Sequence, residues 1–172
     1  MLEKKIDKKN VYREYLLLFL QEISIACPAC KKHAFVLTPD YVFGYPIQTR
    51  LQCFNCNHTE EKSMNHNLYF FNGRLRDKMN DQTQIVGIPI DPFFHQPLWF
   101  QMPYKDHVLW GYSREHLKDV LNALTSLLER NYGTKRSLRT HLIKHLPKWL
   151  RENVADRMAA AKFIENWLNE SV

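Results

Sequence analysis

Four cysteines are the residues of this chain whose type and spacing most directly predict chemistry. Cys27 and Cys30 enclose Pro-Ala, and Cys53 and Cys56 enclose Phe-Asn. Two residues between paired cysteines let the backbone curl into a knuckle that aims both sulfurs at one point, and two knuckles supply a tetrahedral zinc site. The pattern therefore predicts one Zn²⁺ ion. Because four thiolates leave no coordination position open for water, the ion would be structural and not catalytic.

Other uses of the cysteines fit the sequence less well. Two disulfides need an oxidising compartment, but Met1–Asn10 has a charged start with no apolar export signal after it. A thioredoxin-like redox site needs one reactive pair inside a βαβ pattern, not two matching pairs. An iron centre on the same four sulfurs stays open as the alternative to zinc. His33 and His58 lie beside the pairs, although a full set of thiolates makes a histidine ligand unnecessary.

The residues between the cysteine pairs have to bring the two knuckles together. Around Phe35–Leu37 and Tyr41–Leu51, β-branched and aromatic residues predict short strands, interrupted by Pro39, Gly44 and Pro46. Such strands can form the hairpin that a two-knuckle site requires.

Periodic apolar residues predict helices at both ends of the chain. From Asn10 to Ile23 they recur at three- and four-residue intervals, which favours a helix, although the neighbouring Leu17 and Leu18 leave a buried strand open as the alternative. Ser113 suits a helix N-cap, and a clean leucine stripe follows it from Leu117 to Leu128. A further helical region is interrupted by Pro147 and resumes from about Asn153.

Two hairpins are predicted between these helices. After Leu68–Phe71 the dipeptide Asn72-Gly73 is a hairpin-turn signal, and apolar residues alternate in 98–102 and again in 108–112. The second hairpin carries Trp99, Trp110 and Tyr112, which could form a stacking platform for bases. Since a leucine-striped helix begins directly afterwards, we expect them instead on the core side of a sheet.

These elements predict an α+β protein with a four-cysteine zinc ribbon, a small antiparallel β region and C-terminal helices. We expect a boundary near residue 80. It separates a domain of residues 1–80, with the N-terminal helix, the ribbon and the following hairpin, from a domain of residues 81–172, with the second hairpin and the C-terminal helices.

The two Cys-X-X-Cys pairs resemble the zinc ribbons of RNA polymerase subunits, transcription factors and replication proteins, over about residues 24–60. Ribbon knuckles often carry glycine directly after the second cysteine, where this chain has Lys31 and Asn57. Beyond the ribbon, the segments 97–101, 108–112 and 115–117 look similar to a group of small bacterial zinc-ribbon proteins without firmly assigned activity. This resemblance implies an architecture and no particular chemistry.

The positive charge of the chain permits contact with a polyanion. Lys and Arg total 24 against 18 Asp and Glu, which gives a formal net charge of +6. The basic residues gather toward the C-terminus, and those predicted to contact nucleic acid are Lys135, Arg136, Arg139, Lys144, Lys148 and Arg151. If one helix ran through Pro147, several of them would share a face that suits a phosphate backbone, whereas a solvated helix face is the alternative.

No catalytic pattern stands out in the sequence. His141 and His145 are four apart, but residue 142 is Leu and not the Glu of a zinc protease helix. Asp91, Asp106 and Glu115 could converge in space, although a solvated face is the expected place for each. We therefore predict a non-enzymatic binding module for nucleic acid or a nucleic-acid-handling complex. A protein-interaction adaptor and an enzyme with a scattered His/Asp/Glu site are the alternatives.

The sequence also predicts where the protein works. Its longest uninterrupted apolar run, Leu16–Leu20, is far shorter than the roughly twenty residues of a membrane-spanning helix. We expect a soluble cytoplasmic protein that has no membrane partner. The oligomeric state is left open.

Overall fold

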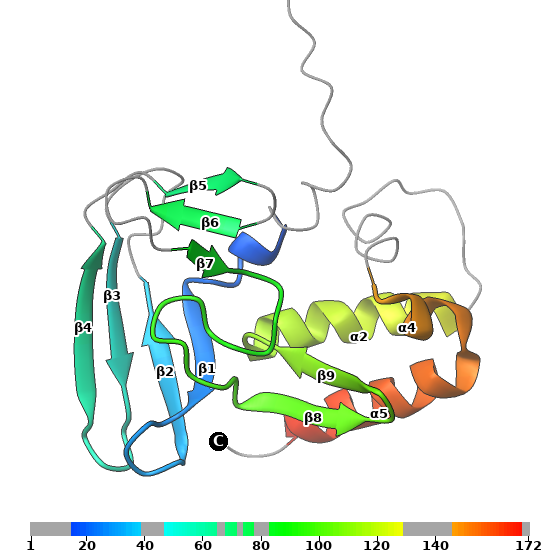
Figure 1. Ribbon diagram of the computed structural model, residues 1–172. Helices are drawn as coiled ribbons and strands as arrows, with labels where there is room; N and C mark the ends of the chain where they lie inside the picture. Colours follow the sequence, from blue (N-terminus) through cyan, green and yellow to red (C-terminus); the bar gives the residue numbers. More distant parts are fainter. Residues whose placement is uncertain are drawn as a thin grey trace, which may run out of the picture. The chain divides into compact units, whose positions relative to one another are not determined.

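The chain folds into a strand-rich unit, Met1–Ser113, followed by a helical unit, Arg114–Val172. The computed structural model describes residues 15–38, 47–64, 68–71, 74–77, 83–128 and 146–169 (Figure 1). Antiparallel sheets and helices together confirm the predicted α+β class. The boundary predicted near residue 80 lies outside the described residues.

A four-stranded antiparallel sheet forms the first part of the strand-rich unit. Its strands are β1 (Glu22–Ala26), β2 (His33–Leu37), β3 (Ile47–Gln52) and β4 (Thr59–Met64), and they lie side by side in that order (Figure 1). In the register, Ile25 is opposite Ala34, and Val36 is opposite Leu51. In β2 and β3 the apolar residues alternate with more exposed ones, so one face of the sheet is buried, whereas in β1 Ser24 is buried as well as Ile23 and Ile25.

The core of this unit collects on that face. Ile23, Ile25, Val36 and Leu51 are fully buried there. They belong to the same cluster as three leucines from before β1, namely Leu16, Leu17 and Leu20. The other face is more exposed, with Phe35 half-buried and Arg50 exposed. A single buried face fixes the register, because a slip of one residue would expose every apolar side chain.

The chain enters β1 earlier than the sequence predicts. Residues 15–17 are helical, and β1 already begins at Glu22, so the helix predicted as far as Ile23 is wrong at its C-terminal end. Ile23 pairs with Val36, and sheet pairing overrides the local helical periodicity there. Thr38 fixes the junction, because its Oγ1 donates to the carbonyl of Leu20 at 2.5 Å. The part of the predicted helix before residue 15 lies outside the described residues.

A hairpin of β8 (Phe100–Tyr104) and β9 (His107–Gly111) confirms the second predicted hairpin. The residues just before and after it attach to the free edge of β1. The N–H of Trp99 donates to the carbonyl of Ser24 at 2.9 Å, and the N–H of Ser24 donates to the carbonyl of Tyr112 at 2.7 Å. Tyr112 is fully buried and its hydroxyl accepts the N–H of Gly87 at 2.8 Å, so this aromatic residue belongs to the core as predicted. Trp110 is half-buried against the core, but Trp99 is 38% exposed, so the core prediction is wrong for Trp99.

A three-stranded sheet accounts for the first predicted hairpin. It consists of β5 (Leu68–Phe71), β6 (Arg74–Asp77) and β7 (Thr83–Ile85), in that order. Phe71 is opposite Arg74, which is the pairing that an Asn-Gly hairpin turn predicts. The turn residues 72–73 themselves lie outside the described residues.

The helical unit contains α2 (Arg114–Leu128), α4 (Lys148–Glu152) and α5 (Val154–Asn169). The helix α2 begins directly after Ser113, as predicted, and its leucine stripe is buried at Leu117 and Leu124. It packs antiparallel to α5, because the guanidinium of Arg114 at its start donates to the carbonyl of Leu168 near the end of α5. Ile164 of α5 is likewise fully buried.

Side-chain caps define the short break between α4 and α5. Pro147 precedes α4 in an extended conformation with ψ 144°, and Asn153 ends the helix with φ −110°. The Oδ1 of Asn153 then accepts the N–H of Asp156 at 3.2 Å, as an N-cap of α5 does. The guanidinium of Arg157 donates to the carbonyls of Leu150 and Arg151, which are otherwise orphaned at the end of α4.

In the described parts of the chain, no helix is both long enough and apolar enough to cross a membrane.

Candidate metal centre

The sheet topology brings the two cysteine pairs to one end of the sheet. Cys27 and Cys30 lie in the connection between β1 and β2, and Cys53 and Cys56 lie in the connection between β3 and β4. Because β2 and β3 are antiparallel neighbours, these two connections leave the sheet at the same end. The predicted strands therefore do what the two-knuckle arrangement requires of them.

Both connections contain the same backbone turn. In the first, the N–H of Cys27 donates to the carbonyl of Lys32 at 2.8 Å, and in the second the N–H of Cys53 donates to the carbonyl of His58 at 2.9 Å. The residue after each second cysteine is left-handed, with φ 62° at Lys31 and φ 57° at Asn57. The absence of glycine at these two positions does not prevent the turn.

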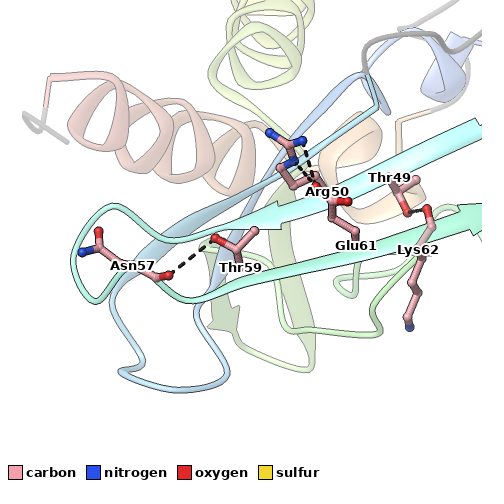
Figure 2. A network of polar contacts seen from close by, with 6 residues as sticks. All are labelled: Thr49, Arg50, Asn57, Thr59, Glu61 and Lys62. Atoms are coloured by element: carbon pink, nitrogen blue, oxygen red, sulfur yellow. Dashed lines mark hydrogen bonds and ion pairs between the residues drawn. The ribbon is translucent and has the colours of Figure 1, made fainter.

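The hairpin of β3 and β4 holds the second turn in place (Figure 2). Arg50 and Glu61 face each other across the strands, and the Arg50 Nη2 lies 2.8 Å from the Glu61 Oε1. Beside them, the Oγ1 of Thr49 donates to the carbonyl of Lys62 at 3.2 Å. Since Arg50 and Glu61 are both exposed, this ion pair contributes little stability, and the backbone ladder positions the cysteines.

The four sulfurs lie where one metal ion could bind all of them. The Sγ atoms of Cys27 and Cys56 are 3.7 Å apart, those of Cys30 and Cys53 are 3.6 Å apart, and all four lie within 4.8 Å of one another. A tetrahedron with metal–sulfur bonds of about 2.3 Å has edges of about 3.8 Å. A disulfide needs about 2.05 Å, and all four cysteines are free thiols. The spacing therefore fits tetrahedral thiolate coordination.

Burial and hydrogen bonding shift the pKa values of two of the thiols in opposite directions. Burial raises the pKa of Cys53, but backbone hydrogen bonds from Cys56 and Asn55 and contacts with two thiols outweigh it and lower that pKa to about 7. A backbone hydrogen bond from His58 lowers the pKa of Cys56, but burial and the three neighbouring thiols raise it to about 12. Four thiolates this close together repel one another, so a bound cation is needed before all four can be ionised.

Neither neighbouring histidine joins the cluster. Among the described residues, the group of potential metal donors consists of the four cysteines alone. The ring of His33 packs instead between aromatic rings, with its centroid 4.4 Å from that of Phe35 and 5.1 Å from that of Trp99. His58 is half-buried. Among the described residues, the four cysteine sulfurs therefore make up the whole set of potential metal donors.

The predicted nucleic-acid-binding residues fall largely outside the described chain. Lys135, Arg136, Arg139 and Lys144 are not among the described residues. Lys148 and Arg151 lie exposed on α4, and the Lys148 Nζ is 3.7 Å from the Glu152 Oε2. The helix does not continue through Pro147, because that residue is extended and precedes α4.

The three carboxylates considered for catalysis have separate structural places. Asp91 is buried, and its carboxylate accepts the N–H groups of Phe93 at 2.9 Å, Phe94 at 2.8 Å and Gln96 at 2.6 Å. Burial raises the pKa of Asp91 despite these bonds. Asp106 is exposed in the turn between β8 and β9, and on α2 the Glu115 Oε1 lies 3.5 Å from the Lys118 Nζ. The Asp91 carboxylate thus stabilises the turn that contains Phe93, Phe94 and Gln96.

A hollow of about 370 Å³ lies against the β3–β4 hairpin. Its lining consists of one leucine and polar residues of the two strands: Leu37, Gln48, Thr49, Arg50, Glu61, Lys62 and Ser63. Arg50 and Glu61 are paired with each other inside it, and the lining contains neither cysteine nor histidine.

No protein-family model, curated protein or solved structure matches this chain.

Proposed function

We propose that the strand-rich unit contains a zinc ribbon and that the protein is a non-enzymatic module that binds nucleic acid. The observation that carries this proposal is the convergence of the Sγ atoms of Cys27, Cys30, Cys53 and Cys56 within 4.8 Å of one another, at one end of an antiparallel sheet. A metal ion held by four thiolates has no vacant position for water or substrate, so it stabilises the fold and does not react.

Zinc is the metal that the donor set favours. Zn²⁺ accepts tetrahedral thiolate coordination without a geometric preference of its own, and structural sites of four cysteines are common among zinc proteins. The bound ion would neutralise thiolates that otherwise repel one another, and its binding energy would add directly to the stability of the two connections. Iron on the same four sulfurs is the competing assignment, and elemental analysis distinguishes the two.

The charge of the chain supports nucleic acid as the ligand. The formal net charge is +6, and Lys148 and Arg151 are exposed on α4. Phosphate contacts by such residues release counterions, which makes the affinity fall steeply as salt rises. The other four proposed contact residues are Lys135, Arg136, Arg139 and Lys144.

Retention of DNA and RNA at low and high salt tests this function. The zinc-loaded protein should retain a nucleic acid at about 50 mM salt and lose most of it at about 200 mM. The substitutions Lys148→Ala and Arg151→Ala should each weaken retention and flatten the salt dependence, while Lys118→Ala on α2 serves as the control. Absence of retention at low salt would refute the nucleic-acid assignment and leave the zinc assignment intact.

A protein-interaction adaptor is the second candidate, and the position of β4 favours it. This strand is the last in the order β1-β2-β3-β4, and residues 59–63 are exposed. An edge strand can pair with a strand of another chain. The charged side chains of Glu60, Glu61 and Lys62 oppose pairing with an unselected strand, because charge on an edge strand prevents aggregation. Capture of a protein by the nuclease-treated module, with no nucleic acid retained, would favour this function.

A further inference from the structure

Four aromatic side chains follow one another beside the cysteine cluster, and we refer to them as the aromatic row. Its members are Phe54, Phe35, His33 and Trp99. Ring centroids are 6.0 Å apart between Phe54 and Phe35, 4.4 Å between Phe35 and His33, and 5.1 Å between His33 and Trp99. The row is therefore continuous from the second cysteine pair to the segment that pairs with β1.

The two ends of the row are open to solvent. Phe54 is 67% exposed and Trp99 is 38% exposed, while Phe35 and His33 between them are half-buried. Phe54 stands between two cysteines of the cluster, where the first pair has Pro28 at the equivalent position. An aromatic ring this exposed adds little to the core, and a single exposed ring would be unremarkable. Phe54 is joined through Phe35 and His33 to the exposed Trp99, and adjoining exposed rings of this kind are typical of a contact surface.

The backbone beneath the row is fixed at several points. The Nδ2 of Asn55 donates to the carbonyl of His33 at 3.3 Å, which ties the second cysteine pair to the start of β2. The N–H of Trp99 donates to the carbonyl of Ser24 at 2.9 Å, which ties the other end to β1. A bound metal ion would hold Phe54 between two of its ligands. The rings are thus presented in a set arrangement before any ligand arrives.

Charge at this surface is close to balanced. The two connections that hold the cysteines contain Lys31 and Lys32 and no acidic residue. Four thiolates on one divalent ion carry a formal charge of −2, which these two lysines offset. The row therefore has little attraction for phosphate itself but offers aromatic faces, and every unpaired base has a matching face.

We infer that the aromatic row is a stacking surface for the unpaired bases of single-stranded nucleic acid. This inference rests on the proposed function, which supplies the attraction to phosphate through basic residues elsewhere in a chain of net charge +6. It also specifies that the nucleic acid is single-stranded, because the bases of a duplex are stacked on each other and have no free face. Phe54 and Trp99, at the exposed ends, would make the main contacts.

Fluorescence anisotropy with zinc-loaded protein tests the inference. The probes are a labelled thymidine oligonucleotide of about 15 nucleotides and a duplex of the same length. We expect tighter binding to the single strand. The variant Phe54→Ala should weaken that binding between about fivefold and a hundredfold, which is the range of one base–aromatic stack. Phe54→Tyr, which keeps a ring, should restore it.

The salt dependence separates stacking from phosphate contact. Phe54→Ala should lower the affinity at every salt concentration by the same factor, because no ion pair is lost. Leu18→Ala is the matched control, since Leu18 is 62% exposed and lies outside the row. Metal content and thermal unfolding of each variant establish that it remains folded.

Different outcomes overturn different statements. If neither probe binds at low salt, the proposed function fails and the inference fails with it. If both probes bind equally and Phe54→Ala binds like the unaltered protein, the inference alone is wrong. If Phe54→Ala instead abolishes self-association of the protein while single-strand binding is unchanged, the row is a contact between two copies of the chain, which also overturns it.

Discussion

Lys31 and Asn57 have matching left-handed backbones, with φ 62° and φ 57°, and each follows the second cysteine of its pair. A left-handed conformation costs a residue other than glycine about 1–2 kcal/mol, and asparagine tolerates it better than lysine. The same turn is therefore made twice, at a higher conformational cost in the first connection than in the second.

Replacing Lys31 with glycine should stabilise the protein. Lys31→Gly removes the left-handed strain and should raise the free energy of unfolding by about 1 kcal/mol. The exposed hydrogen bond from the Lys31 Nζ to the carbonyl of Pro28, 2.9 Å long, offsets only a small part of this gain. Chemical denaturation of the zinc-loaded protein measures the change.

Lys32→Gly is the matched control, because Lys32 is not among the residues with positive φ. Glycine there adds flexibility to the unfolded chain without relieving strain, so the free energy of unfolding should stay equal or fall. A destabilised Lys31→Gly protein would mean that the left-handed turn is not the strained element.

The cap between α4 and α5 should be measurable in the same way. Asn153→Ala removes the Oδ1 that accepts the N–H of Asp156 at 3.2 Å, and loss of an N-cap costs about 1 kcal/mol. Asn122→Ala, an identical substitution at an exposed position within α2, should be neutral or slightly stabilising because alanine favours helix. Equal effects of the two substitutions would contradict the capping role.

His116 should make the stability fall in acid. Burial lowers the pKa of His116 to about 3, from 6.5 in the unfolded chain. Between these values the unfolded chain binds a proton that the folded protein does not, so stability is complete above about pH 6.5 and is lost toward pH 3. From pH 7 to pH 5 this one residue should remove about 2 kcal/mol.

Denaturant unfolding of His116→Gln and the unaltered protein at both pH values isolates this contribution. The variant should lose less stability on acidification, and Asn122→Gln, at an exposed position of α2, should behave like the unaltered protein. Identical pH dependence in all three proteins would show that His116 does not titrate as its burial implies.

The sequence predicts the cysteine cluster and the second hairpin better than the N-terminal region. Two Cys-X-X-Cys pairs constrain the metal donors through local chemistry alone, and alternating residues before and after Pro103 are a local signal for β8 and β9. The entry into β1 is different, because Ile23 follows a helical period in the sequence and pairs with Val36 in the sheet. Pairing with β2 therefore determines that Ile23 lies in a strand and not in a helix.

Two further features depend on tertiary structure. The dipeptide Asp91-Pro92 signals a turn, but nothing local shows that the Asp91 carboxylate is buried and accepts three backbone N–H groups. The aromatic row likewise depends on tertiary structure. Phe54 stands in the sequence as one residue of a Cys-Phe-Asn-Cys pair, whereas its neighbour Phe35 comes from β2 and Trp99, at the other end of the row, comes from the segment before β8.

Loss of one thiolate should release the metal and loosen the sheet end. Cys53→Ser leaves three sulfurs and should lower the thermal stability of residues 24–60, because metal binding contributes to the stability of a small ribbon. Hydrogen exchange should accelerate at the N–H of Cys27, which donates to Lys32 across the first connection. Ser63→Ala, at an exposed position of β4, should leave exchange there unchanged.

The metal content of the purified, reduced protein tests the central claim most directly. Elemental analysis should find one zinc ion per chain, and the same analysis of Cys53→Ser should find little or none. A metal-free unaltered protein, or a Cys53→Ser protein that keeps its zinc and its thermal stability, would contradict the four-thiolate site.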